Sequence, residues 1–428
     1  MRHAPIDAKL FLANRANLTR LLLPNSAAVV NANDILPTNA DGTLPLRQSS
    51  DLFYLTGVDQ EESILLLYPD AHDEKFREIL FLRETNDLIA TWEGHKLDKQ
   101  EARKVTGILR VEWLSEFRKI FHRVMCECEH VYLNTNEHPR AVIEVETREA
   151  RFVADTLLRY PLHDYQRLAR LMRRLRVVKS DTEVELIRQA CAITKAGFVR
   201  VCKLVKPGLN EMEVEAGFAR EFIRRGGDFA YTPIIASGAN ACVLHYIDND
   251  QPCRKGDLLL LDVAARHAHY NADLTRTIPV SGRFTRRQRQ VYHAVLRVLR
   301  AVSKAATPGK LPKDWQKEAE QFIEKELVDL GLLKLSEIRK QDPDKPAFKK
   351  YFMHGVGHPL GLDVHDVGPV TEPMQAGWVL TVEPGIYIKE EGLAVRLEND
   401  ILLREGGNTD LMADIPIEAE EIEELMNR

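Results

Sequence analysis

The sequence contains no long apolar run, few cysteines and no strong excess of one charge, and each absence excludes a class of protein. No apolar run approaches the roughly 20 residues that a membrane-spanning helix needs, so we expect no membrane partner. The stretch from Met1 to Leu23 has scattered charges instead of the continuous apolar core of a signal peptide. Six cysteines in 428 residues do not form a disulfide framework, which favours reduced thiols and a cytoplasmic location. The net charge of −5 lacks the basic excess of a nucleic-acid-binding protein.

The composition is instead typical of a globular protein with two domains. Hydrophobic residues make up 44% of the chain and charged residues 29%, and 428 residues exceed what one compact core usually serves. Near residue 172 a basic connector leads to Ser180, which with Glu183 forms a capping box before a long amphipathic stretch. We therefore predict one domain over residues 1–171 and a second over residues 172–428.

The first domain alternates short apolar runs with stretches of helical periodicity. The runs Ser63–Pro69, Glu78–Glu84 and His130–Asn136 predict buried strands, because they are short, apolar and bounded by turn residues. Strands that alternate with helices predict an α/β domain, and we expect its sheet to be mixed.

Two aspartates mark the first candidate site in the second domain. Asp262 interrupts a run of leucines and valine, where a carboxylate is costly unless it is paired or bound to a metal. Asp273 follows on what we predict to be the partner strand of a hairpin, and two paired strands can bring both carboxylates together. For either aspartate alone, a structural cap or salt bridge is as plausible as a ligand.

Three further charged residues interrupt apolar strands near the C-terminus. Glu383 ends an apolar run just before Pro384 and Gly385. Arg396 and Glu398 lie two apart within another predicted strand, so that both point to the same face. A simple buried arginine–glutamate pair would explain these two residues when they are considered alone.

The stretch from Tyr351 to Gly368 places His354, His358 and His365 among four glycines and a proline. Glycine and proline argue against a regular helix, so we expect a strand and loop that face a cleft. One neutral imidazole with four carboxylates carries a charge of about −4, which balances two divalent cations. This mixture of oxygen ligands and one imidazole suits Mn, Fe, Co or Zn. Two such ions about 3.5–4 Å apart form the active site of many hydrolytic enzymes.

These residues resemble a known family. Asp262, Asp273, His358, Glu383 and Glu398 have the order and contexts of the metal ligands of the pita-bread metallopeptidases, and "HGVGHPLGLDVHD" is similar to the signature of the aminopeptidase P and prolidase branch. "LPLRQSSDLFYLTGVDQEESILLLYP" and "TWEGHKL" resemble the N-terminal half of aminopeptidase P. The resemblance implies an α/β N-terminal domain followed by an α+β pita-bread (creatinase/aminopeptidase-like) catalytic domain.

The resemblance also implies the ligands of two divalent metal ions, with manganese favoured and zinc, cobalt or iron as alternatives. Asp273 and Glu398 resemble the carboxylates that bridge both ions. His358 and Glu383 resemble the ligands of one ion, and Asp262 resembles a ligand of the other. The family nucleophile is a metal-bridging hydroxide, for which Glu383 would be the general base.

Further residues match positions around the family's active site. His365 and His245 resemble the imidazoles that hold the substrate and its tetrahedral intermediate, and His354 resembles a third histidine that lines the cleft. Arg396 resembles the arginine that holds the neighbouring carboxylates in place. Tyr387 either borders the same cleft and binds substrate or is a core aromatic.

The implied activity is hydrolysis of the Xaa–Pro bond at the N-terminus of a proline-containing peptide. The alternative with the same chemistry is a prolidase, which is restricted to dipeptides. A non-catalytic peptide-binding module and a metal-free hydrolase such as creatinase are disfavoured because all five ligands are present. The family also implies a homo-oligomer, a dimer or tetramer, in which Trp92 either reaches a neighbour's active site or is a partly buried core residue.

Overall fold

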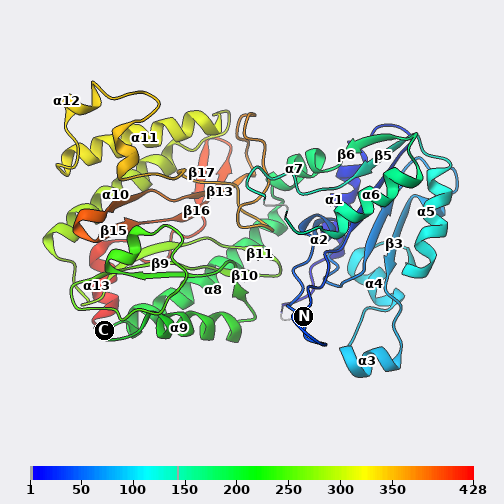
Figure 1. The fold of residues 1–428 in the computed structure, drawn as a ribbon, viewed down its shortest axis with the longest axis horizontal. Coiled ribbons are helices and arrows are strands. Elements are labelled where there is room, and N and C mark those ends of the chain that lie inside the picture. Colours follow the sequence, from blue (N-terminus) through cyan, green and yellow to red (C-terminus); the bar gives the residue numbers. More distant parts are fainter. Residues whose placement is uncertain (1–2, 142–143) are drawn as a thin grey trace. The chain divides into compact units, whose positions relative to one another are not determined.

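The computed structural model describes residues 3–141 and 144–428, and it divides the chain into two compact units. The N-terminal unit is His3–Arg176 and the C-terminal unit is Val177–Arg428. In Figure 1 the first unit is coloured from blue to teal and the second from green to red. The division falls near the end of helix α7 (Ala169–Val177), a few residues after the predicted position between residues 171 and 172.

The N-terminal unit is built on a six-stranded mixed sheet with the strand order β4-β3-β2-β1-β5-β6. The central strands β1, β2 and β3 pair antiparallel, whereas β4 pairs parallel with β3, and β5 and β6 extend the other edge in parallel. The prediction of an α/β domain with a mixed sheet is confirmed. The strands are β1 (Ser26–Asn31), β2 (Ile64–Leu67), β3 (Glu78–Leu82), β4 (Arg110–Trp113), β5 (His130–Leu133) and β6 (Asp164–Arg167).

Helices α5 (Phe117–Met125) and α6 (Arg148–Arg159) pack on one face of this sheet through a common hydrophobic cluster. Three other helices of the unit are α1 (Ala8–Thr19), α2 (Ser50–Thr56) and α4 (Lys99–Thr106). The buried Arg15 of α1 joins them, because it donates hydrogen bonds to the carbonyl oxygens of Leu55 and Thr106. Helix α3 (Asp87–Glu93) has no buried residue.

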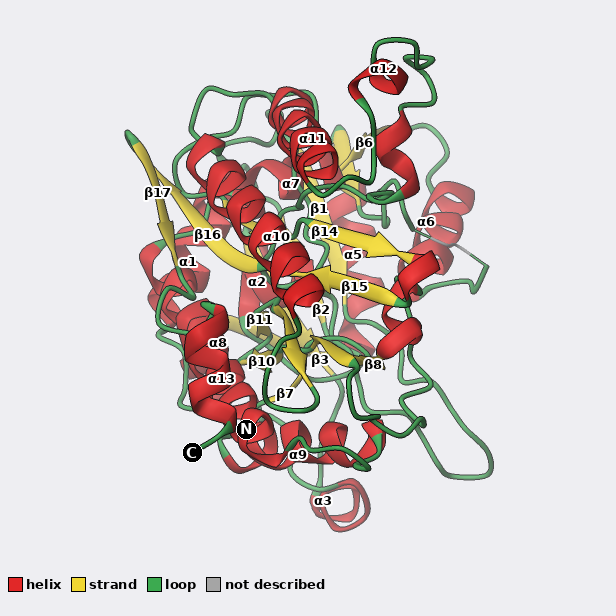
Figure 2. Cartoon of the chain, turned by 90° about the vertical axis from the view of Figure 1, so that its left-hand side faces the viewer, coloured by secondary structure: helices red, strands yellow, loops and turns green. Residues whose placement is uncertain are grey.

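Three long helices of the C-terminal unit begin at capping boxes. The predicted capping box at Ser180 is confirmed and begins α8 (Asp181–Leu204). Asn210 caps α9 (Glu211–Arg224), which packs along α8, and Thr285 caps α10 (Arg286–Ala305). Helix α10 contacts β13, β14, β15 and β17, and Figure 2 shows it in the middle of this group of strands, with β17 on its left and β15 on its right. The remaining helices are α11 (Pro312–Asp329), α12 (Leu335–Ile338) and α13 (Ala419–Met426).

The strands of the C-terminal unit pair antiparallel in four short sheets, with the orders β12-β9-β8, β13-β16-β17, β14-β15 and β11-β10-β7. Antiparallel sheets with helices packed on them form the α+β architecture that the resemblance implied. The strands are β7 (Asp228–Phe229), β8 (Ile234–Ser237), β9 (Leu258–Asp262), β10 (Ala265–His267), β11 (Tyr270–Asn271), β12 (Thr275–Pro279), β13 (Val379–Val382), β14 (Gly385–Ile388), β15 (Leu393–Arg396), β16 (Asn399–Arg404) and β17 (Gly407–Asp410).

Two strands that we predicted as continuous are broken where the candidate ligands lie. The chain leaves β11 before Asp273 and enters β12 only at Thr275. Arg396 ends β15, which pairs with β14, whereas β16 pairs with β13. Between them the Glu398 N–H donates to the Thr275 carbonyl oxygen. The prediction that Arg396 and Glu398 share one strand is therefore wrong, because the backbone changes its hydrogen-bond partner between them.

Within the described ranges 3–141 and 144–428, no helix is both long and apolar enough to cross a membrane.

Candidate metal centre

Two neighbouring strands bring the predicted aspartates to one place. Asp262 ends β9, whose preceding leucines are all buried. Thr275, the first residue of β12, lies directly opposite Asp262 in the antiparallel register, and Asp273 stands two residues earlier. The Asp273 N–H donates to a carboxylate oxygen of Asp400 at 3.0 Å, which holds this short non-strand segment in place. Sheet pairing therefore brings together two carboxylates that are eleven residues apart.

The segment that contains His358 runs beside β13 like an extra strand. Val356 accepts from Glu383 N–H at 2.8 Å, His358 accepts from Thr381 N–H at 2.9 Å, and Leu360 donates to Val379 at 3.0 Å. Gly357 is required for this approach, because a Cβ atom there would lie 2.1 Å from the carbonyl oxygen of Thr381. The prediction that this glycine-rich stretch is not a helix is confirmed.

Asp273, His358 and Glu398 form a cluster that could hold a metal ion. One potential ligand atom from each side chain lies within 4.8 Å of the others. His358 Nε2 is 3.6 Å from Asp273 Oδ2 and also 3.6 Å from Glu383 Oε1. Asp273 is 5% exposed and Glu398 is 2% exposed, so little water reaches these carboxylates. One nitrogen among several carboxylate oxygens is a suitable donor set for a divalent transition metal.

The orientation of the His358 ring agrees with a ligand role. Its Nδ1 lies 2.9 Å from the Pro359 carbonyl oxygen, which can only accept, so Nδ1 must carry the hydrogen in the neutral ring. The lone pair of Nε2 then faces the carboxylates. A backbone carbonyl that fixes the tautomer is common behind a metal-bound imidazole. The His358 N–H also donates to the Thr381 hydroxyl at 3.0 Å, which anchors the residue.

The electrostatics of the cluster favour the uptake of positive charge. Burial raises the pKa of Asp273 well above its ordinary value, and the nearby Asp262 and Asp400 raise it further. Burial likewise raises the pKa of Glu398, with added repulsion from Asp273 and Glu383. Carboxylates that crowd together in a buried site must either take up protons or bind cations. The residues present therefore fit a divalent metal.

Arg396 connects Asp262 to the rest of the site. Its guanidinium donates to Asp262 Oδ2 at 2.7 Å and to the Tyr387 hydroxyl at 2.8 Å. Its Nε donates to the Thr275 hydroxyl, which in turn donates to Glu398 Oε2 at 2.7 Å. The arginine thus pairs with Asp262 and reaches Glu398 through Thr275, which differs from the simple Arg396–Glu398 pair considered above.

Tyr387 and His354 extend this network. Tyr387 is 1% exposed and packs in a hydrophobic cluster, while its hydroxyl lies 2.8 Å from His354 Nε2. Because Arg396 can only donate, the Tyr387 hydroxyl directs its own hydrogen to His354. His354 Nδ1 lies 2.8 Å from the Gly355 carbonyl and 3.5 Å from Glu383 Oε2. Burial lowers the pKa of His354 to about 3, so this ring is neutral at pH 7.

The remaining predicted residues lie nearer the surface. His365 is exposed and stacks on the His358 ring, with centroids 4.0 Å apart. His245 is exposed in the segment after η3 (Gly238–Cys242), and the next residue, Tyr246, donates to Glu211 at 2.8 Å. Trp92 belongs to the N-terminal unit and is 82% exposed, so the alternative that it is a core residue is wrong.

Several supporting residues were missed from the sequence. The Tyr231 hydroxyl donates to Asp262 Oδ1 at 2.6 Å, and Thr275, Thr381 and Asp400 make the hydrogen bonds described above. Thr381 gave a usable signal, since it is a polar residue within the apolar strand β13. Thr275 gave none, because β12 is itself rich in polar residues. Tyr231 gave none, because it lies 31 residues before Asp262 and meets it only through the fold.

Comparisons with known proteins agree with this geometry. The sequence model of metallopeptidase family M24 matches residues 185–405, and that of the aminopeptidase P N-terminal domain matches residues 11–132. The Xaa-Pro aminopeptidase of Haemophilus influenzae is 34% identical over 99% of this chain and 98% of its own length, and that of Escherichia coli is 33% identical over 98% of each. The solved structure of Escherichia coli aminopeptidase P with the inhibitor Pro-Leu has a TM-score of 0.87 and 32% identity over 99% of both chains. This chain therefore belongs to metallopeptidase family M24 and, within that family, to the aminopeptidase P group.

Proposed function

We propose that this chain is a metal-dependent aminopeptidase that hydrolyses the Xaa–Pro bond at the N-terminus of peptides. The observation that carries the proposal is the convergence of a ring nitrogen of His358 with the buried carboxylates of Asp273 and Glu398. Full-length similarity to Xaa-Pro aminopeptidases supports this substrate class. The same similarity disfavours a prolidase, and the complete set of candidate ligands disfavours a non-catalytic binding module.

We propose that Asp262, Asp273, His358, Glu383 and Glu398 hold two divalent ions, with manganese favoured over zinc, cobalt or iron. The oxygen-rich donor set with a single imidazole supports this choice. When bound, such ions supply an activated water and polarise the scissile carbonyl. The raised pKa values of Asp273 and Glu398 support binding of cations, because cations would relieve the repulsion between these carboxylates.

Side chains of the protein would transfer the proton, bind the substrate and position the ligands. Glu383, whose side chain is 20% exposed, is placed to accept a proton and pass it to the leaving amine. The exposed His365 and His245 would hold the substrate carbonyl and its tetrahedral intermediate by hydrogen bonds. His354, which is neutral and held by Tyr387, would line the proline side of the cleft. Arg396 would fix Asp262 and, through Thr275, Glu398.

We also propose a cytoplasmic homo-oligomer, a dimer or tetramer, in which Trp92 reaches the active site of a neighbouring copy. The exposed indole on α3, a helix with no buried residue, supports a contact with another chain. The six free cysteines support a reducing compartment. Sedimentation of the wild-type protein and of Trp92→Ser tests the oligomer, and loss of turnover in assembled Trp92→Ser tests the reach of the indole.

Hydrolysis of Ala-Pro-Ala and Ala-Pro by protein stripped of metal and then given Mn²⁺ tests the function. We expect release of alanine from the tripeptide that depends on Mn²⁺, with no release before metal is added. Cleavage of the dipeptide alone would assign a prolidase instead. No cleavage of either peptide, with metal bound, would overturn the proposal of an aminopeptidase.

A further inference from the structure

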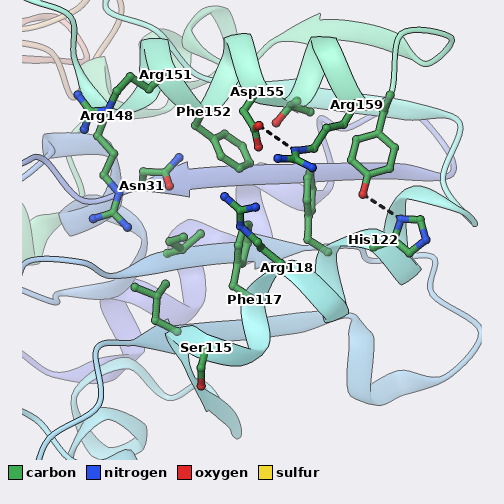
Figure 3. A pocket seen from close by; sticks show the side chains of 15 residues that line it. Asn31, Ser115, Phe117, Arg118, His122, Arg148, Arg151, Phe152, Asp155 and Arg159 are labelled. Atoms are coloured by element: carbon green, nitrogen blue, oxygen red, sulfur yellow. Dashed lines mark hydrogen bonds and ion pairs between the residues drawn. The ribbon is translucent and has the colours of Figure 1, made fainter.

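The N-terminal unit contains a cavity of about 840 Å³ between α5 and α6, where it is also lined by Asn31 at the end of β1 and Ile64 at the start of β2. Figure 3 shows the side chains of both helices that line it. Its volume is within the range of sites that hold small organic molecules, about 300–1,000 Å³. The proposed peptidase chemistry uses none of these residues, so the cavity needs a separate explanation.

The cavity has an aromatic wall. The rings of Phe117 and Phe121 are stacked with centroids 5.3 Å apart, and Phe152 from the opposite helix lies 5.5 Å from Phe121 and 5.9 Å from Phe117. Phe117 and Phe121 are anchored in the core of the unit, at 7% and 5% exposure. Such fixed rings offer an apolar surface on which a flat molecule can pack.

The other lining side chains make the cavity positive. Four arginines and one aspartate line it. Arg151 pairs with Asp34 at 2.8 Å, and Arg159 pairs with Asp155 at 2.8 Å. Among the residues that the structure describes, neither of the other two arginines, Arg118 and Arg148, has a hydrogen bond or an ion pair. In Figure 3 Arg118 extends from α5 into the space between the helices, and Arg148 lies toward the Asn31 end.

Arg148 is the more costly of these two cations. It is half-buried, and burial lowers its pKa, although the carboxylates of Asp34, Glu62 and Glu149 oppose that effect. Glu149 is a poor counter-ion, because its oxygens accept from the N–H and side-chain amide of Asn31 and burial raises its pKa to about 7. A half-buried guanidinium that finds no hydrogen-bond acceptor among the described residues loses hydration that the more distant carboxylates replace only in part.

We propose that this cavity binds a small organic anion in which a phosphate or carboxylate group is joined to a flat aromatic ring. The ring packs against the phenylalanine wall, and the guanidiniums of Arg148 and Arg118 supply the donors and the positive charge for the acid group. Guanidinium is well suited to both phosphate and carboxylate, because its planar fork of N–H donors matches their oxygens.

Isothermal titration calorimetry of the full-length protein with 1-naphthyl phosphate and with 1-naphthoate tests this proposal. We expect saturable binding of at least one of the two, and the stronger of them identifies the acid group. Arg148→Gln should weaken binding about tenfold and Arg118→Gln about two- to threefold, because the half-buried donor is less screened by water. Arg170→Gln, which removes an exposed charge of the same unit outside the cavity, is the matched control and should bind like the wild type.

Further measurements separate this cavity from the metal centre and test each part of the ligand. His358→Ala should retain full affinity for the probe while peptidase activity is lost, so the two proposals can fail independently. 1-Naphthol and inorganic phosphate should each bind far more weakly than the joined molecule. Equal affinity in Arg148→Gln and wild type, equal affinity for 1-naphthol, or loss of binding in His358→Ala would each overturn the proposal.

Discussion

The Glu398 carboxylate is buried, accepts a hydrogen bond from the Thr275 hydroxyl, and lies in one cluster with Asp273 and His358. A carboxylate in this setting is stabilised most when a bound cation neutralises its charge. We predict that Glu398→Ala and Asp273→Ala lose bound metal and with it peptidase activity by more than about a hundredfold. Metal analysis of the purified variants measures this, and full occupancy in Glu398→Ala would contradict a ligand role.

Two variants serve as comparisons for that experiment. His365→Ala should lower turnover about tenfold to a hundredfold, because it removes the proposed hydrogen bond to the tetrahedral intermediate. Metal should be retained, because His365 is exposed and stacks on His358 without joining the cluster. Glu405→Ala removes an exposed carboxylate of the same unit and should change neither quantity. Loss of metal from His365→Ala would show that the stacked ring holds His358 in place.

Glu149 in the N-terminal unit predicts a specific dependence of stability on pH. Burial raises its pKa from an ordinary 4.5 to about 7, so the folded chain binds this proton more tightly than the unfolded chain. The stabilisation is complete below about pH 4.5 and is lost as the pH rises through about 7, by up to about 3 kcal/mol. Urea unfolding at several pH values measures this. Across this interval, the unfolding free energy of the wild type should fall relative to that of Glu149→Gln. The exposed Glu144→Gln should show no such trend.

At the scale of elements, the site depends on the segment around His358 lying against β13. Gly357→Ala should destabilise the protein by about 1–3 kcal/mol and displace His358, because the added Cβ would lie 2.1 Å from a backbone oxygen that cannot rotate away. Gly355→Ala is the matched control, since its nearest neighbour would be 3.8 Å away. Thermal unfolding and metal content of the two variants measure the effect, and equal behaviour would mean that β13 can shift to admit the methyl group.

The same scale explains which predictions of secondary structure succeeded. The strands β2, β3 and β5 and the helix α8 were predictable, because apolar runs and a capping box are local signals. The breaks at Asp273 and between Arg396 and Glu398 were not, because a strand ends there when its backbone changes partner. The alternation of apolar and polar residues along the chain does not indicate which strand accepts a hydrogen bond from a given N–H.

At the scale of the whole molecule, metal binding should stabilise only part of the chain. Removal of metal with a chelator leaves buried carboxylates that repel each other, so we expect faster amide hydrogen exchange around β12, β13 and β16. Strands β1, β2 and β5 belong to the other unit and should be unchanged. Mass spectrometry of peptides before and after addition of Mn²⁺ measures this, and an equal change in both units would contradict it.

The sequence by itself determined the chemistry of this protein. Carboxylates in apolar surroundings and a glycine-rich histidine stretch were enough to predict candidate ligands, because burying charged groups is costly unless they are paired or bound to a metal. Chain length predicted two domains, and the resemblance of these segments and of the N-terminal motif to known sequences identified the family. Only the tertiary structure decided how these side chains are satisfied. The pairing of Arg396 with Asp262, the hydrogen bond from Tyr231 and the arginine-lined cavity of the N-terminal unit all join residues far apart in the chain. Such contacts follow from the packing of whole elements, which local patterns in a single sequence do not record.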